Sequence, residues 1–288
     1  MDEVRNDARP GSLYIVATPI GNLEDITLRA LKVLEQVDLV AAEDTRHTGR
    51  LLANFKIKNA LISCHDHNEK SRVADLLKKL EAGRSIALVS DAGTPSVSDP
   101  GFALVKAAVK NRIPVVPIPG VSAAITALSA SGLPTDTFSF VGFMPKKKKK
   151  RNEKLKQLAT ESGTLVFYES PKRIIDLMES IVAVMGNRYL VLARELTKYH
   201  EEFLRGPASG IIPVLKARKT IKGECTLLVS GNDEGDKVTI DDIKDEIRQG
   251  LSDRDTRLSV LSKEIAKQYN LSRSKVYDAA LKIKREEE

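Results

Sequence analysis

Short apolar segments alternate with amphipathic segments over most of this chain, and this alternation limits the folds that it can adopt. The clearest apolar segment is Ser85–Ser90, which leads into a turn rich in Gly, Pro, Ser and Thr over Asp91–Gly101. The order of strand, loop and helix recurs at Leu13–Ala17, Leu39–Ala42 and Val115–Ile118. Strands that alternate with helices in this way form largely parallel α/β sheets.

A second α/β half is expected to begin around Gly132–Pro134. Apolar runs predict its strands at Phe138–Val141, Thr164–Tyr168, Tyr189–Ala193 and Glu224–Ser230. The residues from Thr239 onward lack strand signals and are predicted to be helical, and Gly231–Asp236 has the composition of a linker. The predicted organisation is an N-terminal α/β domain over 12–132, a second α/β domain over 133–231 and a small helical region over 240–288.

Two helix boundaries can be predicted from local signals. Asp25 is a suitable N-cap for a helix that runs to Gln36. In the second half, a run of basic residues is expected to form a loop, and a helix is expected to start at about Asn152.

Composition excludes several classes of protein. The 288 residues include 46 Lys and Arg against 39 Asp and Glu, a formal net charge of +7, which permits a polyanionic partner. No stretch approaches the roughly 18 apolar residues of a membrane span, and the polar N-terminus lacks a secretory signal. Cys64 and Cys225 are the only cysteines, which indicates a reducing compartment and a cytoplasmic location.

Three turns that follow predicted strands are candidates for a ligand site, namely Thr18–Asn22, Asp91–Gly101 and Pro119–Ser122. Ligands of open α/β sheets bind beyond the carboxyl ends of the strands. Neither a dinucleotide-binding G-x-G-x-x-G nor a P-loop is apparent. Asp91 can accept hydrogen bonds from ribose hydroxyls or from an amine. The alternative is an ordinary turn in which Asp99 caps the next helix.

Two clusters of ionisable side chains are weaker indications of a functional site. Glu43, Asp44, Arg46 and His47 suit proton transfer or recognition of a polar substrate, or they form a solvated loop with internal ion pairs. Cys64–His67 has metal-binding residue types, but no second cluster completes a tetrahedral site, so no metal is expected.

Basic residues suggest contact with nucleic acid at two places. The first is a predicted loop that contains Lys146, Lys147, Lys148, Lys149, Lys150 and Arg151. The second is in the C-terminal region, where helices from Leu258 and from Ser272 have helix-turn-helix spacing, and where Arg273 and Lys275 lie near the start of the second helix. The alternatives are a solvated charge run and a helical hairpin that only packs on the body or dimerises.

An ordered series of motifs carries a resemblance to a known family. The opening motif, Leu13–Asn22, resembles that of the tetrapyrrole methylase superfamily, which uses S-adenosylmethionine. The complete series resembles the bacterial ribosomal RNA small subunit methyltransferase I family, whose members are cytidine 2′-O-methyltransferases. The further motifs are Ala42–Arg46, Ser90–Pro95, Ser98–Gly101, Pro119–Ala123, Phe140–Phe143, Phe167–Arg173, Arg194–Lys198 and Gly223–Glu224.

The resemblance implies two α/β domains of the tetrapyrrole methylase type with a cofactor cleft between them, a homodimer, and 16S ribosomal RNA in the small subunit as the partner. It implies S-adenosylmethionine as the cofactor. Carried over to this sequence, the cofactor contacts are Pro19, Ile20, Asp91, Gly93, Thr94, Ser122, Ala123, Tyr168, Gly223 and Glu224.

The residue types suggest roles in the transfer itself. A neutral ribose hydroxyl is a poor nucleophile, so it needs alignment and a base. Asp44 or Glu43 is a candidate base, and Lys198 or Arg46 is a candidate for holding the neighbouring phosphate. Two alternatives remain at this stage: a methylase of the same fold that acts on a small tetrapyrrole, and a non-catalytic RNA-binding protein.

Overall fold

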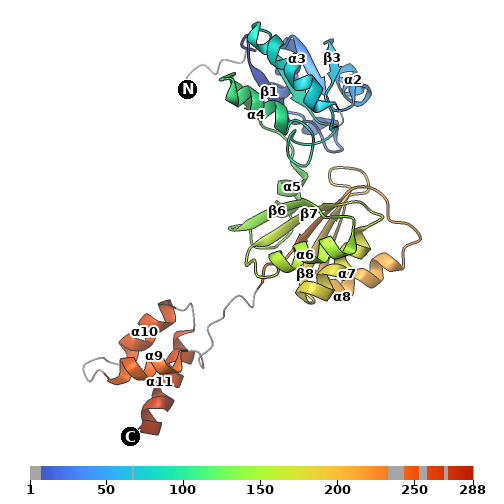
Figure 1. The fold of residues 1–288 in the computed structure, drawn as a ribbon. Coiled ribbons are helices and arrows are strands. Elements are labelled where there is room, and N and C mark those ends of the chain that lie inside the picture. Colours follow the sequence, from blue (N-terminus) through green and yellow to red (C-terminus); the bar gives the residue numbers. More distant parts are fainter. Residues whose placement is uncertain (1–7, 67, 233–242, 253–257, 269–271, 288) are drawn as a thin grey trace. The chain divides into compact units, whose positions relative to one another are not determined.

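The computed structural model describes residues 8–66, 68–232, 243–252, 258–268 and 272–287. The chain divides into two compact units, Met1–Gly231 and Asn232–Glu288, which are described separately below (Figure 1). His67, the predicted linker positions 233–236 and the predicted start of the helical region at Ile240 lie outside the described residues.

The first half of the larger unit contains the expected parallel sheet. Five strands lie in the order β3-β2-β4-β1-β5, and every pairing in this sheet is parallel. Its strands are β1 (Leu13–Val16), β2 (Leu39–Ala42), β3 (Leu61–Ser63), β4 (Ile86–Val89) and β5 (Val115–Ile118). Its helices are α1 (Leu28–Gln36), α2 (Thr45–Asn54), α3 (Glu69–Glu81), α4 (Phe102–Lys110) and α5 (Ala123–Ser129).

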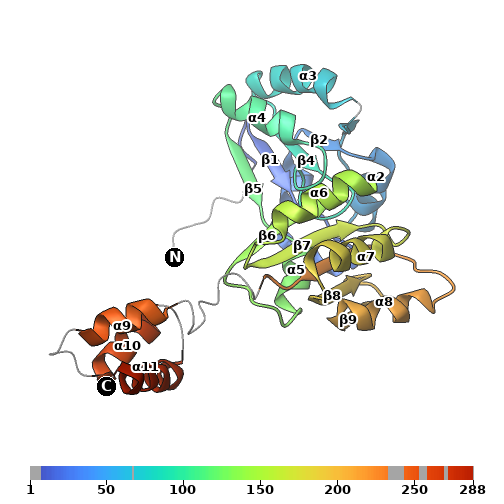
Figure 2. The ribbon, with the colours of Figure 1, turned by 60° about the horizontal axis from the view of Figure 1, so that its bottom comes forward.

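Helices cover both faces of this sheet because its strands carry apolar side chains on both faces. In β4, Ala87 and Val89 pack with residues of α1 and α2, whereas Ile86 and Leu88 pack with residues of α3 and α4. The helices α3 and α4 lie side by side (Figure 2). A continuous apolar strand such as β4 is typical of a parallel sheet that is buried on both sides.

The second half of the larger unit has a mixed sheet in the order β6-β7-β10-β8-β9. Only β6 and β7 pair in parallel; the other three pairings are antiparallel. The strands are β6 (Phe138–Phe143), β7 (Thr164–Glu169), β8 (Tyr189–Arg194), β9 (Glu202–Pro207) and β10 (Cys225–Val229). The helices α6 (Lys148–Leu158), α7 (Ile174–Met185) and α8 (Ala208–Lys216) cover one face, and α5 of the first half covers the other.

Both predicted helix starts were wrong, whereas the predicted end of the first helix at Gln36 is confirmed. The first helix begins at Leu28 because the Thr27 hydroxyl accepts a hydrogen bond from the Ala30 N–H at 3.1 Å and so caps it, while Asp25 ends a short 3₁₀ turn (Leu23–Asp25). The helix of the second half starts at Lys148, so most of the predicted basic loop forms its first turn.

The described residues of the smaller unit form three helices, α9 (Lys244–Ser252), α10 (Leu258–Gln268) and α11 (Arg273–Glu287). They enclose an apolar core of their own. Leu261 and Ile265 are buried in α10, and Val276 and Ala280 are buried in α11. Among the described residues, no helix combines the length and the apolar character needed to cross a membrane.

Candidate functional site

The three predicted turns meet at one edge of the parallel sheet because β4, β1 and β5 are neighbours in it. Thr18 and Gly93 exchange two backbone hydrogen bonds of 2.9 Å, which joins the turn after β1 to the turn after β4. The Thr94 hydroxyl donates to the Val121 carbonyl at 3.3 Å and so links the turn after β5. These bonds hold three backbone segments around one space.

A cavity of about 320 Å³ opens beside these turns. One wall comes from the turns after β1, β4 and β5, and the opposite wall comes from the second sheet and its loops. The lining residues are Ile20, Ala92, Gly93, Thr94, Val97, Asp99, Ser122, Ala123, Phe143, Tyr168, Glu169, Ser170, Pro171, Leu196, Glu224, Cys225 and Thr226. We call this space the first cavity. Its volume is in the range of small-molecule and cofactor sites.

Tyr168 connects the two walls of the first cavity. Its hydroxyl accepts a hydrogen bond of 3.1 Å from the Ala124 N–H at the start of α5. Its ring makes edge contacts with Phe140 and Phe143, with ring centroids 5.0 and 5.8 Å away. Burial raises the pKa of the Tyr168 hydroxyl, so this group stays neutral and serves as a hydrogen-bonding partner.

Three carboxyl groups, those of Asp99, Glu169 and Glu224, line the otherwise largely apolar first cavity. Burial, and then the nearby charge of Glu43, raise the pKa of Asp99 to about 7. Glu169 is 2% exposed, and its carboxylate forms an ion pair of 2.8 Å with Arg173. A cavity with apolar walls and carboxyl groups favours a ligand that combines apolar parts with positive charge.

The loop between Thr94 and Gly101 is strained and firmly held. Ser96 and Ser98 have φ angles of 69° and 66°, a region that L-residues other than Asn and Asp rarely occupy. The alternative in which Asp99 caps α4 is wrong, because Gly101 is the N-cap and has no side-chain cap. The carboxylate of Glu69, from α3, accepts hydrogen bonds from the N–H groups of Gly101 and Ala103 instead. Asp99 is therefore free of a capping role.

A second cavity of about 490 Å³ adjoins the first, and the two share Ile20, Ala92 and Glu224. Its other lining residues are Thr18, Pro19, Gly21, Leu23, His47, Arg50, Leu51, Asn54, Asp91 and Lys198. His47 and Arg50 both belong to α2. The Arg50 guanidinium and the His47 imidazole make this side of the second cavity a candidate for an anionic ligand, while Asp91 and Glu224 add carboxylates to its lining.

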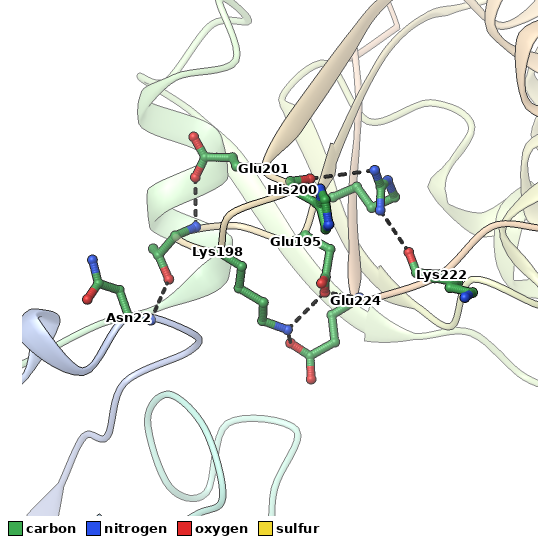
Figure 3. A network of polar contacts seen from close by, with 9 residues as sticks. Asn22, Glu195, Lys198, His200, Glu201, Lys222 and Glu224 are labelled. Carbon is green, nitrogen blue, oxygen red and sulfur yellow. Dashed lines mark hydrogen bonds and ion pairs between the residues drawn. The ribbon is translucent and has the colours of Figure 1, made fainter. Parts of the chain in front are cut away.

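A polar network lies beside the cavities, since Glu224 lines both of them and Lys198 lines the second. Figure 3 shows its contacts. The ammonium of Lys198 contacts the carboxylates of Glu195 at 2.9 Å and Glu224 at 3.1 Å. The Asn22 N–H donates to the Thr197 hydroxyl at 3.0 Å, which ties the turn after β1 to the loop after β8. The charge of Lys198 is thus largely neutralised within the protein, which weakens its case as a phosphate ligand.

Asp44 and Arg46 pair with each other at the start of α2. Asp44 is the N-cap, and its carboxylate accepts hydrogen bonds from the N–H and the guanidinium of Arg46. These bonds hold the pKa of Asp44 far below its usual range. Such a carboxylate is a weak base. Burial raises the pKa of Glu43, whose carboxylate accepts from the Asp91 N–H at 3.2 Å.

The structure brings most of the predicted cofactor residues together. Those that line the first cavity are Ile20, Gly93, Thr94, Ser122, Ala123, Tyr168 and Glu224. Pro19 and Asp91 line the second cavity instead, and Gly223 lines neither. Among the candidate catalytic residues, Lys198 lines the second cavity, whereas Glu43, Asp44 and Arg46 line neither.

Several cavity residues were missed by the sequence interpretation. Val97 and Asp99 lie in a loop that was identified, but nothing in its sequence indicated which side chains face a ligand. Phe143 and Glu169 belong to motifs of the resemblance, and this signal could have added them. Arg50 follows the ionisable cluster along α2 and lines the second cavity together with His47.

The basic residues differ in their surroundings. Lys146, Lys147, Lys148, Lys149 and Lys150 are all exposed. Arg151 was predicted to contact RNA, and this is wrong: the residue is only 5% exposed, and its Nε donates to the buried Ser180 hydroxyl at 3.0 Å. Arg273 and Lys275 are exposed on α11. In the part of the chain that the structure describes, no group of His, Cys, Asp and Glu could hold a metal ion.

Comparisons with known proteins agree with this geometry. Residues 12–212 match the family described as Tetrapyrrole (Corrin/Porphyrin) Methylases. The Ribosomal RNA small subunit methyltransferase I of Escherichia coli O157:H7 is 54% identical over 228 residues, which cover 78% of this chain and 80% of that protein. The enzyme of the same name from Synechocystis sp. is 46% identical over 276 residues, which cover 95% of this chain and 98% of that protein.

A solved structure supports the fold. Uroporphyrin-III C-methyl transferase from Thermus thermophilus, complexed with S-adenyl homocysteine, has a TM-score of 0.54 and 17% sequence identity to this chain. The match covers 76% of this chain and 97% of that protein. The α/β body of this chain therefore has the fold of the tetrapyrrole methylases.

Proposed function

The chain belongs to the ribosomal RNA small subunit methyltransferase I family of tetrapyrrole methylases, and from this premise we propose that it methylates the 2′-hydroxyl of a cytidine in 16S ribosomal RNA. The methyl donor is S-adenosylmethionine. The observation that carries the proposal is the pair of adjoining cavities, one suited to the donor and one with cationic side chains beside it.

The residues of the first cavity fit the donor. Its largely apolar walls and Tyr168 suit the adenosine part, and the backbone of Gly93 and Thr94 can approach the methionine part. Gly93 has a φ of 78°, which glycine adopts without strain, and a Cβ there would meet Ile20 at 3.6 Å. Asp99 and Glu169 supply negative charge for a cationic sulfonium.

When bound, S-adenosylmethionine supplies an electrophilic methyl group on a positively charged sulfur. The protein's contribution is then to position the ribose hydroxyl in line with that methyl group and to remove its proton. His47 and Arg50 of the second cavity are suited to hold a phosphate next to the target ribose. Glu224, shared by both cavities, lies where the two ligands would meet.

The exposed basic surfaces favour RNA over a small tetrapyrrole. The lysines at 146–150 and the basic residues Arg273 and Lys275 would have no role toward a ligand enclosed by the cavities. A phosphate backbone would relieve the mutual repulsion of the lysines at 146–150 and release counterions. We further propose that the protein acts as a homodimer in the cytoplasm and meets its RNA within the small ribosomal subunit.

Methyl transfer to defined substrates tests this function. The protein is incubated with S-adenosylmethionine that carries a labelled methyl group and with small ribosomal subunits from cells that lack this modification. Free 16S RNA and a porphyrinoid serve as comparison substrates. We expect label in the RNA, recovered as 2′-O-methylcytidine after nuclease digestion. Label in the porphyrinoid alone would support the small-molecule alternative, and label in no substrate would support a non-catalytic role.

A further inference from the structure

We propose that Asp99 is the general base that takes the proton from the ribose 2′-hydroxyl, an inference that rests on the proposed methyl transfer. Asp99 was considered from sequence only as a helix cap, and the structure gives that role to Glu69. Its side chain lines the first cavity, whereas the sequence-based candidates Glu43 and Asp44 line neither cavity.

The position of Asp99 is fixed by the strained loop around it. Ser98, with its φ of 66°, precedes Asp99 directly. Gly142 in β6 allows the Ser98 hydroxyl a close approach, since a Cβ at Gly142 would lie 2.9 Å from it. The N–H groups of Gly101 and Ala103 are tied to Glu69. Strain that the surrounding contacts maintain is typical of functional sites, where it orients a particular side chain.

The charges around Asp99 make it a suitable proton acceptor near neutral pH. Burial and the carboxylates of Glu43 and Asp91, at the ends of β2 and β4, raise its pKa to about 7, with a smaller effect of Asp66 beyond β3. A hydrogen bond with Ser90 acts in the opposite direction. Tyr168 and Glu169 of β7 line the same cavity. A base works best when its pKa is near the working pH.

The other carboxylates near the site are less suited. Asp44 is held ionised by Arg46 and is a weak base. Glu43 also has a raised pKa, but its carboxylate accepts the Asp91 N–H at 3.2 Å and lies outside both cavity linings. Its contribution is to raise the basicity of Asp99.

In the proposed step, a proton and a methyl group are transferred. The ribose 2′-oxygen gives its proton to a carboxylate oxygen of Asp99 and forms a bond to the methyl carbon. The bond between that carbon and the sulfur breaks, and its electron pair stays on the sulfur, which becomes neutral. Asp99 then releases the proton to solvent. The products are a 2′-O-methylated ribose, S-adenosylhomocysteine and one proton.

Substitution of Asp99 in the full-length protein tests the proposal by kinetics. At saturating donor, Asp99→Asn is expected to lower kcat for small-subunit methylation by about 10²–10⁴-fold. The wild-type log kcat should rise with pH and level off below pH 7, because the bound sulfonium lowers the pKa of Asp99 from about 7, and the variant should lose this rise. Asp99→Glu should restore part of kcat. The matched control is Asp136→Asn, which removes an exposed carboxylate that lines neither cavity and should change kcat by less than about threefold.

A binding measurement tests Asp99 without any turnover. The positive sulfonium of S-adenosylmethionine should lower the pKa of Asp99 and release up to roughly half a proton at pH 7. Neutral S-adenosylhomocysteine should release less. Calorimetry in two buffers of different ionisation enthalpy measures this difference, and Asp99→Asn should abolish it while it binds S-adenosylhomocysteine within about threefold of wild type.

Failure of the proposed function and failure of the proposed role of Asp99 would give different results. A wild-type protein that binds both ligands but methylates no RNA would contradict the proposed function. An active wild type together with an Asp99→Asn variant that keeps its kcat and its pH profile would overturn only the role of Asp99. A variant that no longer binds S-adenosylhomocysteine would show that Asp99 serves the site's structure, and this would also overturn the proposal.

Discussion

Lys150 and Arg151 are adjacent cations with opposite surroundings. The side chain of Lys150 is exposed, whereas Arg151 packs into the core of the second α/β half next to Leu155 and Ser180. Burial of a guanidinium is tolerated only where its donors find partners. In the sequence both residues belong to one basic run, and the turn of the helix decides which one faces inward. A local motif therefore predicts the charge of this segment but not the direction of each side chain.

Separate substitutions of these two residues should distinguish stability from RNA binding. Arg151→Ala is expected to lower the free energy of unfolding by about 1–3 kcal/mol, since it leaves the buried Ser180 hydroxyl without its donor. Lys150→Ala should change stability by less than about 0.5 kcal/mol. Urea denaturation followed by circular dichroism measures both variants. Equal stability of the two would indicate that the contact between Arg151 and Ser180 contributes nothing.

Among the elements, β9 was not predicted and β4 was predicted clearly, and their positions explain the difference. The strand β4 is buried throughout and has a continuous apolar sequence. The strand β9 lies at the edge of the mixed sheet, includes Glu202, Arg205 and Gly206, and is only partly buried. A strand of this kind is held by its pairing with β8 and by side-chain contacts far away in the sequence.

The ion pairs of Glu202 predict how the stability of the protein depends on pH. The Glu202 carboxylate is bound by the guanidinium groups of Arg218 and Arg194, which lower its pKa to about 2 from an ordinary value of 4.5. Because the pKa is lower in the folded state, the stabilisation is present above about pH 4.5 and is lost as the pH falls toward 2. Glu202→Gln should therefore be less stable than wild type at pH 7, and the difference should shrink at low pH.

Thermal unfolding at several pH values between 2 and 7 measures this difference. Glu153 of α6, which takes part in no ion pair that involves Glu202, provides the matched control, and Glu153→Gln should follow the wild-type curve. A Glu202→Gln variant whose deficit is the same at every pH would argue against the ion pairs as its cause.

Five exposed lysines lie at the start of α6 and directly before it. Replacement of the five lysines at 146–150 by Ser should weaken RNA binding to a similar degree for different sequences. The log–log dependence of affinity on salt should flatten by roughly 0.7 for each phosphate that the protein no longer binds, for single-stranded RNA. Filter binding over a salt series measures the slope.

A comparison variant tests whether the position of the positive charges affects the salt dependence of RNA binding. Lys78→Ser with Lys110→Ser removes positive charges from α3 and α4. Its salt slope should remain that of the wild type. If the variant that lacks the five lysines has the same salt slope as the wild type, these lysines are exposed to solvent and do not contact RNA.

At the scale of the whole molecule, the parallel sheet and its three ligand turns could be predicted because their signals are local: short apolar strands followed by Gly, Pro and Ser. The opposite wall of the first cavity has no such local signal, and only the family resemblance indicated Tyr168 and Glu224 there. It depends on α5 of the first half packing against the second sheet, where Ala127 lies in one apolar cluster with Val166 and Val191. Such a contact between distant segments has no periodic pattern in the sequence. It also makes the two α/β halves one compact unit.

The division of the chain into two units leads to the last prediction, the removal of Ile240–Glu288. The helices of the smaller unit bury Ile247, Leu261 and Val276 in a core of their own, and every residue that lines the two cavities precedes Gly231. The truncated protein should therefore fold and bind S-adenosylhomocysteine within about threefold of the full chain. Methylation of small subunits should fall, because the exposed Arg273 and Lys275 would no longer raise the local concentration of RNA at the site.

Two measurements on the same truncated protein decide between the roles of the smaller unit: calorimetry with S-adenosylhomocysteine, and label incorporation into small subunits. A matched full-length variant, Arg273→Ser with Lys275→Ser, removes the charges and should reproduce part of the loss of methylation. Its helices should remain folded, because both side chains are exposed and the core of this unit contains neither. Full incorporation by the truncated protein would contradict a role in RNA binding. Loss of both ligand binding and incorporation would instead mean that the larger unit needs the helices to fold, although its sheets and cavities contain none of their residues.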